Sequence, residues 1–113
     1  MTASMPHGAR RDAIFDQLWT AAHGAFAERD YETACHALDA ALARARTIRD
    51  TARVMAVGQE AAQQRDHLFQ QDPDAARAAE PDGNPSRERT IQMVYASIAR
   101  QAPAIVSILQ SGA

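Results

Sequence analysis

Three histidines, His23, His36 and His67, come closest to a metal-binding pattern, because zinc sites often take imidazoles from neighbouring helices. Counted outward from the expected turns near residues 30 and 50, all three fall at a similar height in a stack of antiparallel helices. Their helical phases differ, since His36 falls on the outer flank of its helix and His67 opposite the apolar face of its own. We therefore expect solvated histidines and predict neither a metal site nor a cofactor.

The sequence likewise offers few candidate residues for nucleophilic or acid–base catalysis. Cys35, the one cysteine, falls on the expected buried stripe of its helix, where cysteine usually acts as a small hydrophobe. The neighbouring His36 points elsewhere, which argues against a Cys/His pair. The acidic residues are scattered, with no pair on an apolar face, and no glycine-rich loop follows a strand. The sequence predicts no catalytic residues and a protein that is not an enzyme.

All 12 basic residues are arginine, and four of them cluster around the second expected turn: Arg44, Arg46, Arg49 and Arg53. These guanidinium groups could grip an acidic partner or a phosphate. Alternatively, they form a solvated face with favourable cations at a helix C-terminus. A net charge of −2 argues against a nucleic acid partner, because general nucleic-acid binders are basic overall. The bias towards arginine and alanine is typical of a GC-rich bacterial genome.

Length and composition indicate one all-α domain. The chain has 113 residues, alanine is close to a quarter of them, and no strand pattern occurs. A single cysteine cannot form an internal disulfide, and the first residues lack the apolar stretch of a secretory signal. The most apolar segment, 91–109, holds Arg100, Gln101 and Pro103, which argues against a membrane span. We therefore expect a cytoplasmic protein with no membrane partner.

Apolar periodicity predicts four helices, at about 9–29, 31–49, 51–71 and 87–110, with a disordered tail over 1–8 and a loop over 72–86. The first helix gathers its apolar residues in one sector: Ile14, Phe15, Leu18, Trp19, Ala22, Ala25 and Phe26. Asp30 is a natural N-cap for the second helix. The last helix has the clearest stripe, which stays in register across Pro103: Ile91, Val94, Tyr95, Ile98, Ala102, Ile105, Val106 and Leu109.

No glycine or proline separates the second helix from the third. Whether they are distinct is therefore decided by the side of the helix on which the apolar residues fall before and after Thr51. Beyond Thr51, the apolar residues lie on the side opposite Leu38 and Leu42: Val54, Val57, Ala61 and Leu68. A single rigid helix would then bury one face in its first half and the reverse face in its second. The pattern predicts a break between residues 48 and 52, with Asp50 or Thr51 as the new N-cap.

The stretch from Leu18 to Leu42 resembles one tetratricopeptide repeat. That motif has small residues where two helices cross, a turn ending in an aromatic, and then alanine and a large apolar residue on the second helix. The matching residues are Leu18, Ala21, Ala22, Ala25, Asp30, Tyr31, Ala34, Leu38, Ala41 and Leu42. The usual turn glycine is Arg29, and the closing proline is Arg46 or Thr47. A second repeat lacks its turn around residues 62–66, so the third and fourth helices would have to complete the fold.

The resemblance implies that the first helix lines a peptide-binding groove. The matching groove positions are Asp16, Trp19, His23, Phe26 and Ala27. Trp19 and Phe26 fall at the edge of the apolar sector, which suits partly exposed anchors, although both could simply belong to the core. We expect a non-catalytic adaptor or regulatory module that binds another protein. The alternatives are a helical bundle that self-associates as a homodimer, and a bundle that binds a small molecule or a metal.

Overall fold

A computed structural model describes residues 11–71 and 87–112, and the secondary structure within them is entirely helical. The four helices are α1 (Ala13–Ala27), α2 (Tyr31–Thr47), α3 (Thr51–Gln71) and α5 (Arg87–Gln110). The all-α prediction is confirmed, and the bounds of α3 and α5 agree with those expected. The tail predicted over 1–8 and the loop predicted over 72–86 lie outside the described residues.

Helix α1 is shorter than predicted at both ends. Asp12 caps its start, and a left-handed residue follows its last turn. Asp12 has an extended backbone, and its carboxylate accepts a hydrogen bond from the Phe15 amide at 2.8 Å. This is N-cap geometry, so the helix begins at Ala13 and not near residue 9. It ends at Ala27 and not at residue 29, because Arg29 adopts a left-handed conformation with φ 63°.

The predicted break between α2 and α3 is confirmed. Helix α2 ends at Thr47, and Arg49 takes a left-handed φ of 57°. Asp50 then accepts a hydrogen bond from the Arg53 amide at 3.1 Å and so caps α3. Asp30 caps α2 in the same manner, through the Thr33 amide at 3.2 Å. Two left-handed arginines followed by capping aspartates therefore produce both tight turns.

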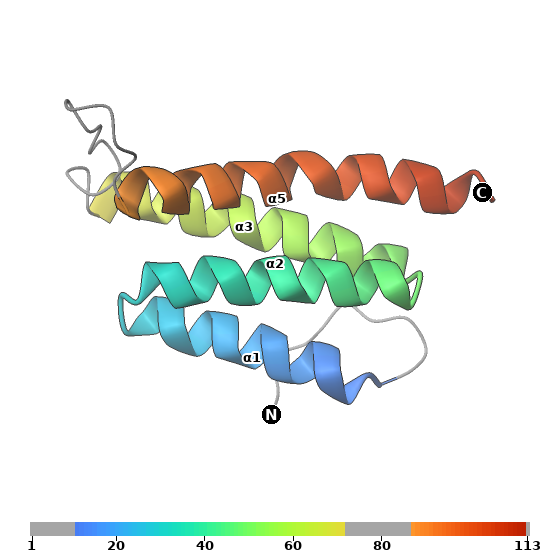
Figure 1. Cartoon of the computed structure of the whole chain (residues 1–113), viewed down its shortest axis with the longest axis horizontal. Helices are drawn as coiled ribbons and strands as arrows, with labels where there is room; N and C mark the ends of the chain where they lie inside the picture. The colour runs from blue at the N-terminus through green and yellow to red at the C-terminus, as the bar shows by residue number, and fades with distance from the viewer. Residues whose placement is uncertain (1–10, 72–86, 113) are drawn as a thin grey trace.

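The helices form two antiparallel pairs, α1 with α2 and α3 with α5, and α2 also packs on α3 and α5 (Figure 1). The core runs between the pairs and includes Phe15, Leu38, Val57, Leu68 and Tyr95, all fully or almost fully buried. Helix α5 continues unbroken through Pro103, as the register of its stripe predicted.

The prediction that Ile14 of α1 belongs to the core is wrong, because its side chain is 51% exposed. Helix α1 packs closely on α2 alone. Its apolar sector is wider than that single contact can cover, so a residue at the sector's edge stays in solvent.

Helices α3 and α5 approach most closely where Gly58 faces Ala102. A Cβ added at Gly58 would lie only 2.5 Å from the Ala102 Cβ, which is far inside van der Waals contact. The missing side chain therefore sets the spacing of this helix pair. That spacing in turn positions Tyr95 of α5 against α3.

Candidate functional site

Of the five positions that the repeat resemblance assigned to a binding groove, Trp19, His23 and Phe26 lie together on one side of α1, and Ala27 is exposed at the end of that helix. Trp19 and Phe26 are half-buried and His23 is exposed. The contacts of these residues reach across to Glu60 and His67 of α3. We refer to the five side chains, Trp19, His23, Phe26, Glu60 and His67, as the α1–α3 face.

Ring contacts hold the aromatic side chains of this face in place. The Trp19 ring stacks on that of Phe15, with centroids 5.8 Å apart, and also contacts the His23 ring at 4.7 Å. The Phe26 ring meets the His67 ring edge-on at 5.3 Å, which joins α1 to α3. Ring contacts therefore fix Trp19 and Phe26, while part of each side chain stays exposed.

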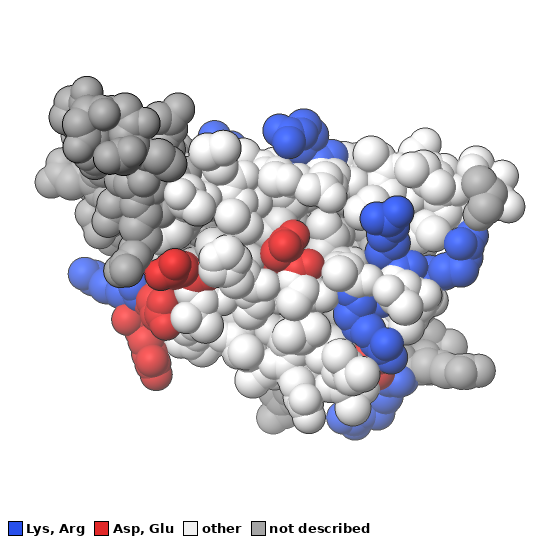
Figure 2. Space-filling view, viewed as in Figure 1, with Lys and Arg blue, Asp and Glu red and all other residues white. Residues whose placement is uncertain are grey.

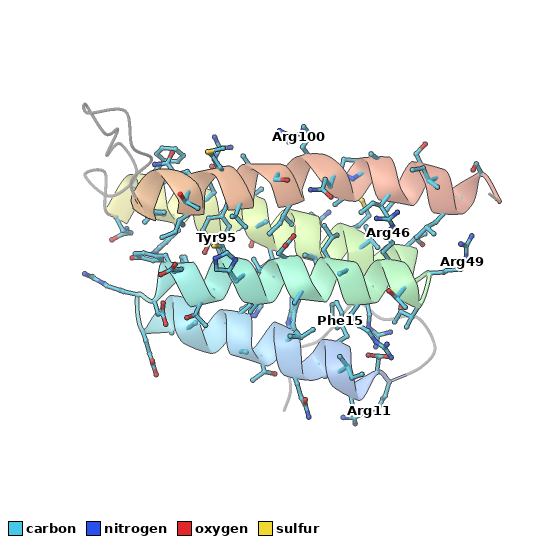
Figure 3. The ribbon with its side chains drawn as sticks, in the orientation of Figure 1. Arg11, Phe15, Arg46, Arg49, Tyr95 and Arg100 are labelled. Atoms are coloured by element: carbon cyan, nitrogen blue, oxygen red, sulfur yellow. The ribbon has the colours of Figure 1, made fainter. Side chains whose placement is uncertain are left out.

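A chain of hydrogen bonds connects this face to the core. The buried Tyr95 hydroxyl donates to Gln64 Oε1 at 2.8 Å, and Gln64 Nε2 donates to Glu60 Oε2 at 3.0 Å. The same carboxylate oxygen lies 3.1 Å from His23 Nε2. Figure 3 shows Tyr95 where α5 lies close to α2, at the inner end of this chain. Burial raises the pKa of the Tyr95 phenol above its usual range, which keeps the hydroxyl protonated as a donor.

His23 has hydrogen-bond acceptors at both ring nitrogens. Its Nδ1 lies 2.9 Å from the Trp19 carbonyl oxygen, and its Nε2 faces the Glu60 carboxylate. Through its contact with Glu60, His23 joins the middle of α1 to the middle of α3.

Asp16, another predicted groove residue, lies in the first turn of α1, one turn before Trp19. Its carboxylate lies 3.9 Å from the guanidinium of Arg11, a side chain that is almost fully exposed. The structure thus brings together Trp19, His23 and Phe26 and leaves Asp16 near the start of α1.

The predicted arginine cluster divides into structural and exposed members. Arg44 forms a bidentate ion pair with Asp12. Its Nε donates to Asp12 Oδ1 at 3.0 Å, and its Nη2 donates to Asp12 Oδ2 at 2.8 Å. This hydrogen bonding lowers the pKa of Asp12 to about 2 and raises that of Arg44. The pair fastens the start of α1 to the end of α2. Arg46 is exposed and lies, with Arg49, at the end of α2 (Figure 3).

Arg53 fits neither of the two readings that the sequence offered for this cluster, because its side chain is buried. Its Nη1 donates to Asp50 Oδ2 at 2.6 Å, and its guanidinium lies 5.2 Å from the centre of the Phe15 ring. The cation–π contact therefore joins α3 to α1, whereas the ion pair with Asp50 lies within the start of α3. The aspartate three residues earlier was the one sequence signal for such a role.

The residues that the sequence raised for nucleophilic or metal chemistry, Cys35, His23, His36 and His67, are spread over α1, α2 and α3. Cys35 is fully buried, and this burial raises its pKa to about 11, which disfavours the nucleophilic thiolate. Within the described residues, no three His, Cys, Asp or Glu side chains gather closely enough to hold a metal ion. The exposed His36 lies on α2, away from the α1–α3 face.

Within residues 11–71 and 87–112, the architecture is all-α, with four helices in two antiparallel pairs. No protein-family model matches the chain, and neither a curated protein nor a solved structure is significantly similar to it. Among the described helices, none combines the length and the apolarity that crossing a membrane requires.

Proposed function

We propose that the protein is a non-catalytic adaptor or regulatory module that binds another protein through the α1–α3 face. One observation carries this proposal: Trp19, His23 and Phe26 line one side of α1, with half-buried rings beside Glu60 and His67 of α3. Tryptophan and other aromatic anchors dominate the energetics of protein interfaces.

We further propose that the helices are arranged as two stacked hairpins of the tetratricopeptide type. The packing of α1 on α2 and of α3 on α5 supports this, as do the side-chain contacts between α1 and α3, the first helices of the two hairpins. In that arrangement, the first helices line the surface that receives a peptide. The second hairpin departs from the usual repeat, since α3 runs to Gln71 with no turn near residues 62–66.

Trp19 offers a direct assay, because it is the one tryptophan in the chain and lies on the proposed face. Peptides would be selected from a random display library against the full chain, synthesised, and titrated while Trp19 fluorescence is followed. We expect saturable binding with a change in Trp19 emission. Phe26→Ala and His23→Ala should each weaken binding about tenfold, as expected for interface anchors.

The matched control is Gln17→Ala, an exposed position on a different side of α1, which should leave the affinity unchanged. Circular dichroism would verify that each variant keeps its helices. The proposal fails if no peptide binds, if bound peptides leave Trp19 emission unchanged, or if Phe26→Ala and His23→Ala bind as well as the parent chain.

A further inference from the structure

The outer side of α2 carries an exposed stripe that none of the described helices covers. Its members recur at three- and four-residue spacing and are exposed: Glu32, His36, Asp39, Ala40, Ala43 and Arg46. The opposite side of the helix packs on α1, α3 and α5. We refer to the part formed by Asp39, Ala40, Ala43 and Arg46 as the α2 face, which is separate from the α1–α3 face.

Charge is divided along this stripe. Glu32 lies in the first turn of α2 and Asp39 at its middle, whereas Arg46 lies in its last turn. Figure 2 shows red atoms mainly over the α1–α2 turn and the middle of α2, and a group of blue atoms where α2 leads to α3, with further blue atoms at the α1–α2 turn and over α5. Between the charges lie Ala40 and Ala43, whose small side chains let another helix approach closely.

The spacing of Asp39 and Arg46 makes the α2 face complementary to itself. Seven residues are almost two helical turns, so the two side chains project from the same side of α2 about 10 Å apart. A two-fold axis perpendicular to the helix near Ala43 exchanges the two positions. Asp39 of each copy then meets Arg46 of the other copy, and both ion pairs form at once around the alanines. A parallel arrangement in register would instead place like charges together.

We propose that the α2 face binds a second copy of this chain, with the two α2 helices antiparallel and Asp39 of each paired with Arg46 of the other. Charge complementarity under this symmetry selects a second copy as the occupant. The contact leaves Trp19, His23 and Phe26 outside the interface. Dimerisation and ligand binding at the α1–α3 face can therefore succeed or fail independently.

Sedimentation velocity of the full chain over a wide concentration range tests the proposal. We expect a reversible monomer–dimer equilibrium that weakens at high salt, because exposed ion pairs are screened. Arg46→Asp and Asp39→Arg should each weaken dimerisation about tenfold, since by symmetry each substitution replaces two attractive pairs with two repulsive ones. Asp66→Arg is the matched control, an exposed charge reversal on α3 that should change nothing.

Mixing the two single variants gives a sharper test. The Arg46→Asp chain presents two acids and the Asp39→Arg chain two arginines, so an antiparallel pair of one copy of each restores both ion pairs. We expect each variant alone to be monomeric at concentrations where their mixture forms a heterodimer. The double variant Asp39→Arg/Arg46→Asp should self-associate like the parent chain.

A parent chain that stays monomeric at all concentrations would overturn the proposal. So would a dimer indifferent to either charge reversal, or single variants that fail to associate when mixed. If the parent chain is monomeric but the α2 face binds a different protein, the self-recognition proposed here is equally wrong.

Discussion

Replacing Tyr95 with phenylalanine removes one oxygen from the core and leaves Gln64 without its donor. The Tyr95 side chain is fully buried and Gln64 is 2% exposed, so water has little access to the carbonyl that loses its partner. Stranding a buried acceptor costs about 1–3 kcal/mol, more than the net value of the hydrogen bond itself. We expect Tyr95→Phe to lower the free energy of unfolding by this amount and the melting temperature by roughly 4–12 °C.

A double-mutant cycle read out by urea unfolding separates this cause from lost packing. Gln64→Leu alone strands the Tyr95 hydroxyl, and the Tyr95→Phe/Gln64→Leu variant leaves neither group unpaired. The double variant should therefore lose less stability than the sum of the single losses, with a coupling of about 0.5–3 kcal/mol. Strictly additive losses, or a Tyr95→Phe variant as stable as the parent, would show that the hydrogen bond between α3 and α5 does not act as argued.

Three other measurements probe separate parts of the fold. Asp12 has a folded pKa of about 2, below its ordinary value of 3.8. Its contribution to stability is therefore complete above pH 3.8 and is lost as the pH falls through about 2. Asp12→Asn should lower the urea midpoint at neutral pH, and the difference from the parent should vanish in strong acid. Gly58→Ala should destabilise the α3–α5 pair by about 1–3 kcal/mol in thermal melts, and Ala102→Gly in the same chain should recover part of the loss. Cys35, with its pKa raised to about 11 by burial, should react with a thiol reagent only as fast as the chain unfolds, and rapid labelling of the native protein would contradict its buried placement.

The helices were predictable where one local signal dominated. The reversal of apolar phase after Thr51 predicted the break that Arg49 and Asp50 make, and the stripe of α5 stayed in register across Pro103. The predicted start of α1, near residue 9, was too early, because Asp12 caps the helix with its side-chain hydrogen bond to the Phe15 amide.

The polar contacts of the candidate site were not predictable, because they join residues that are far apart in the sequence. The phase of α1 placed Trp19 and Phe26 at the edge of the apolar sector, and both are half-buried. Nothing in the sequence indicated that Glu60 would contact His23, since this depends on how α3 is rotated against α1. Arg53 was assigned to the surface for the same reason: its burial requires Phe15 above it, which only the tertiary packing supplies.

The contacts of α1 suggest why a binding surface would lie at this edge of the molecule. Helix α1 packs closely on α2, but it reaches α3 through side chains: His23 to Glu60, Phe26 to His67, and Phe15 to Arg53. The contacts of His23 and Phe26, which are not fully buried, can adjust by rotamer changes, whereas the buried Phe15–Arg53 contact and the close α3–α5 contact at Gly58 cannot. A ligand at the α1–α3 face can therefore rearrange His23 and Phe26 without repacking the core. Binding surfaces are drawn from the less stable parts of a fold. Amide hydrogen exchange should therefore be faster in α1 than in α3, and ligand binding should slow the exchange in α1.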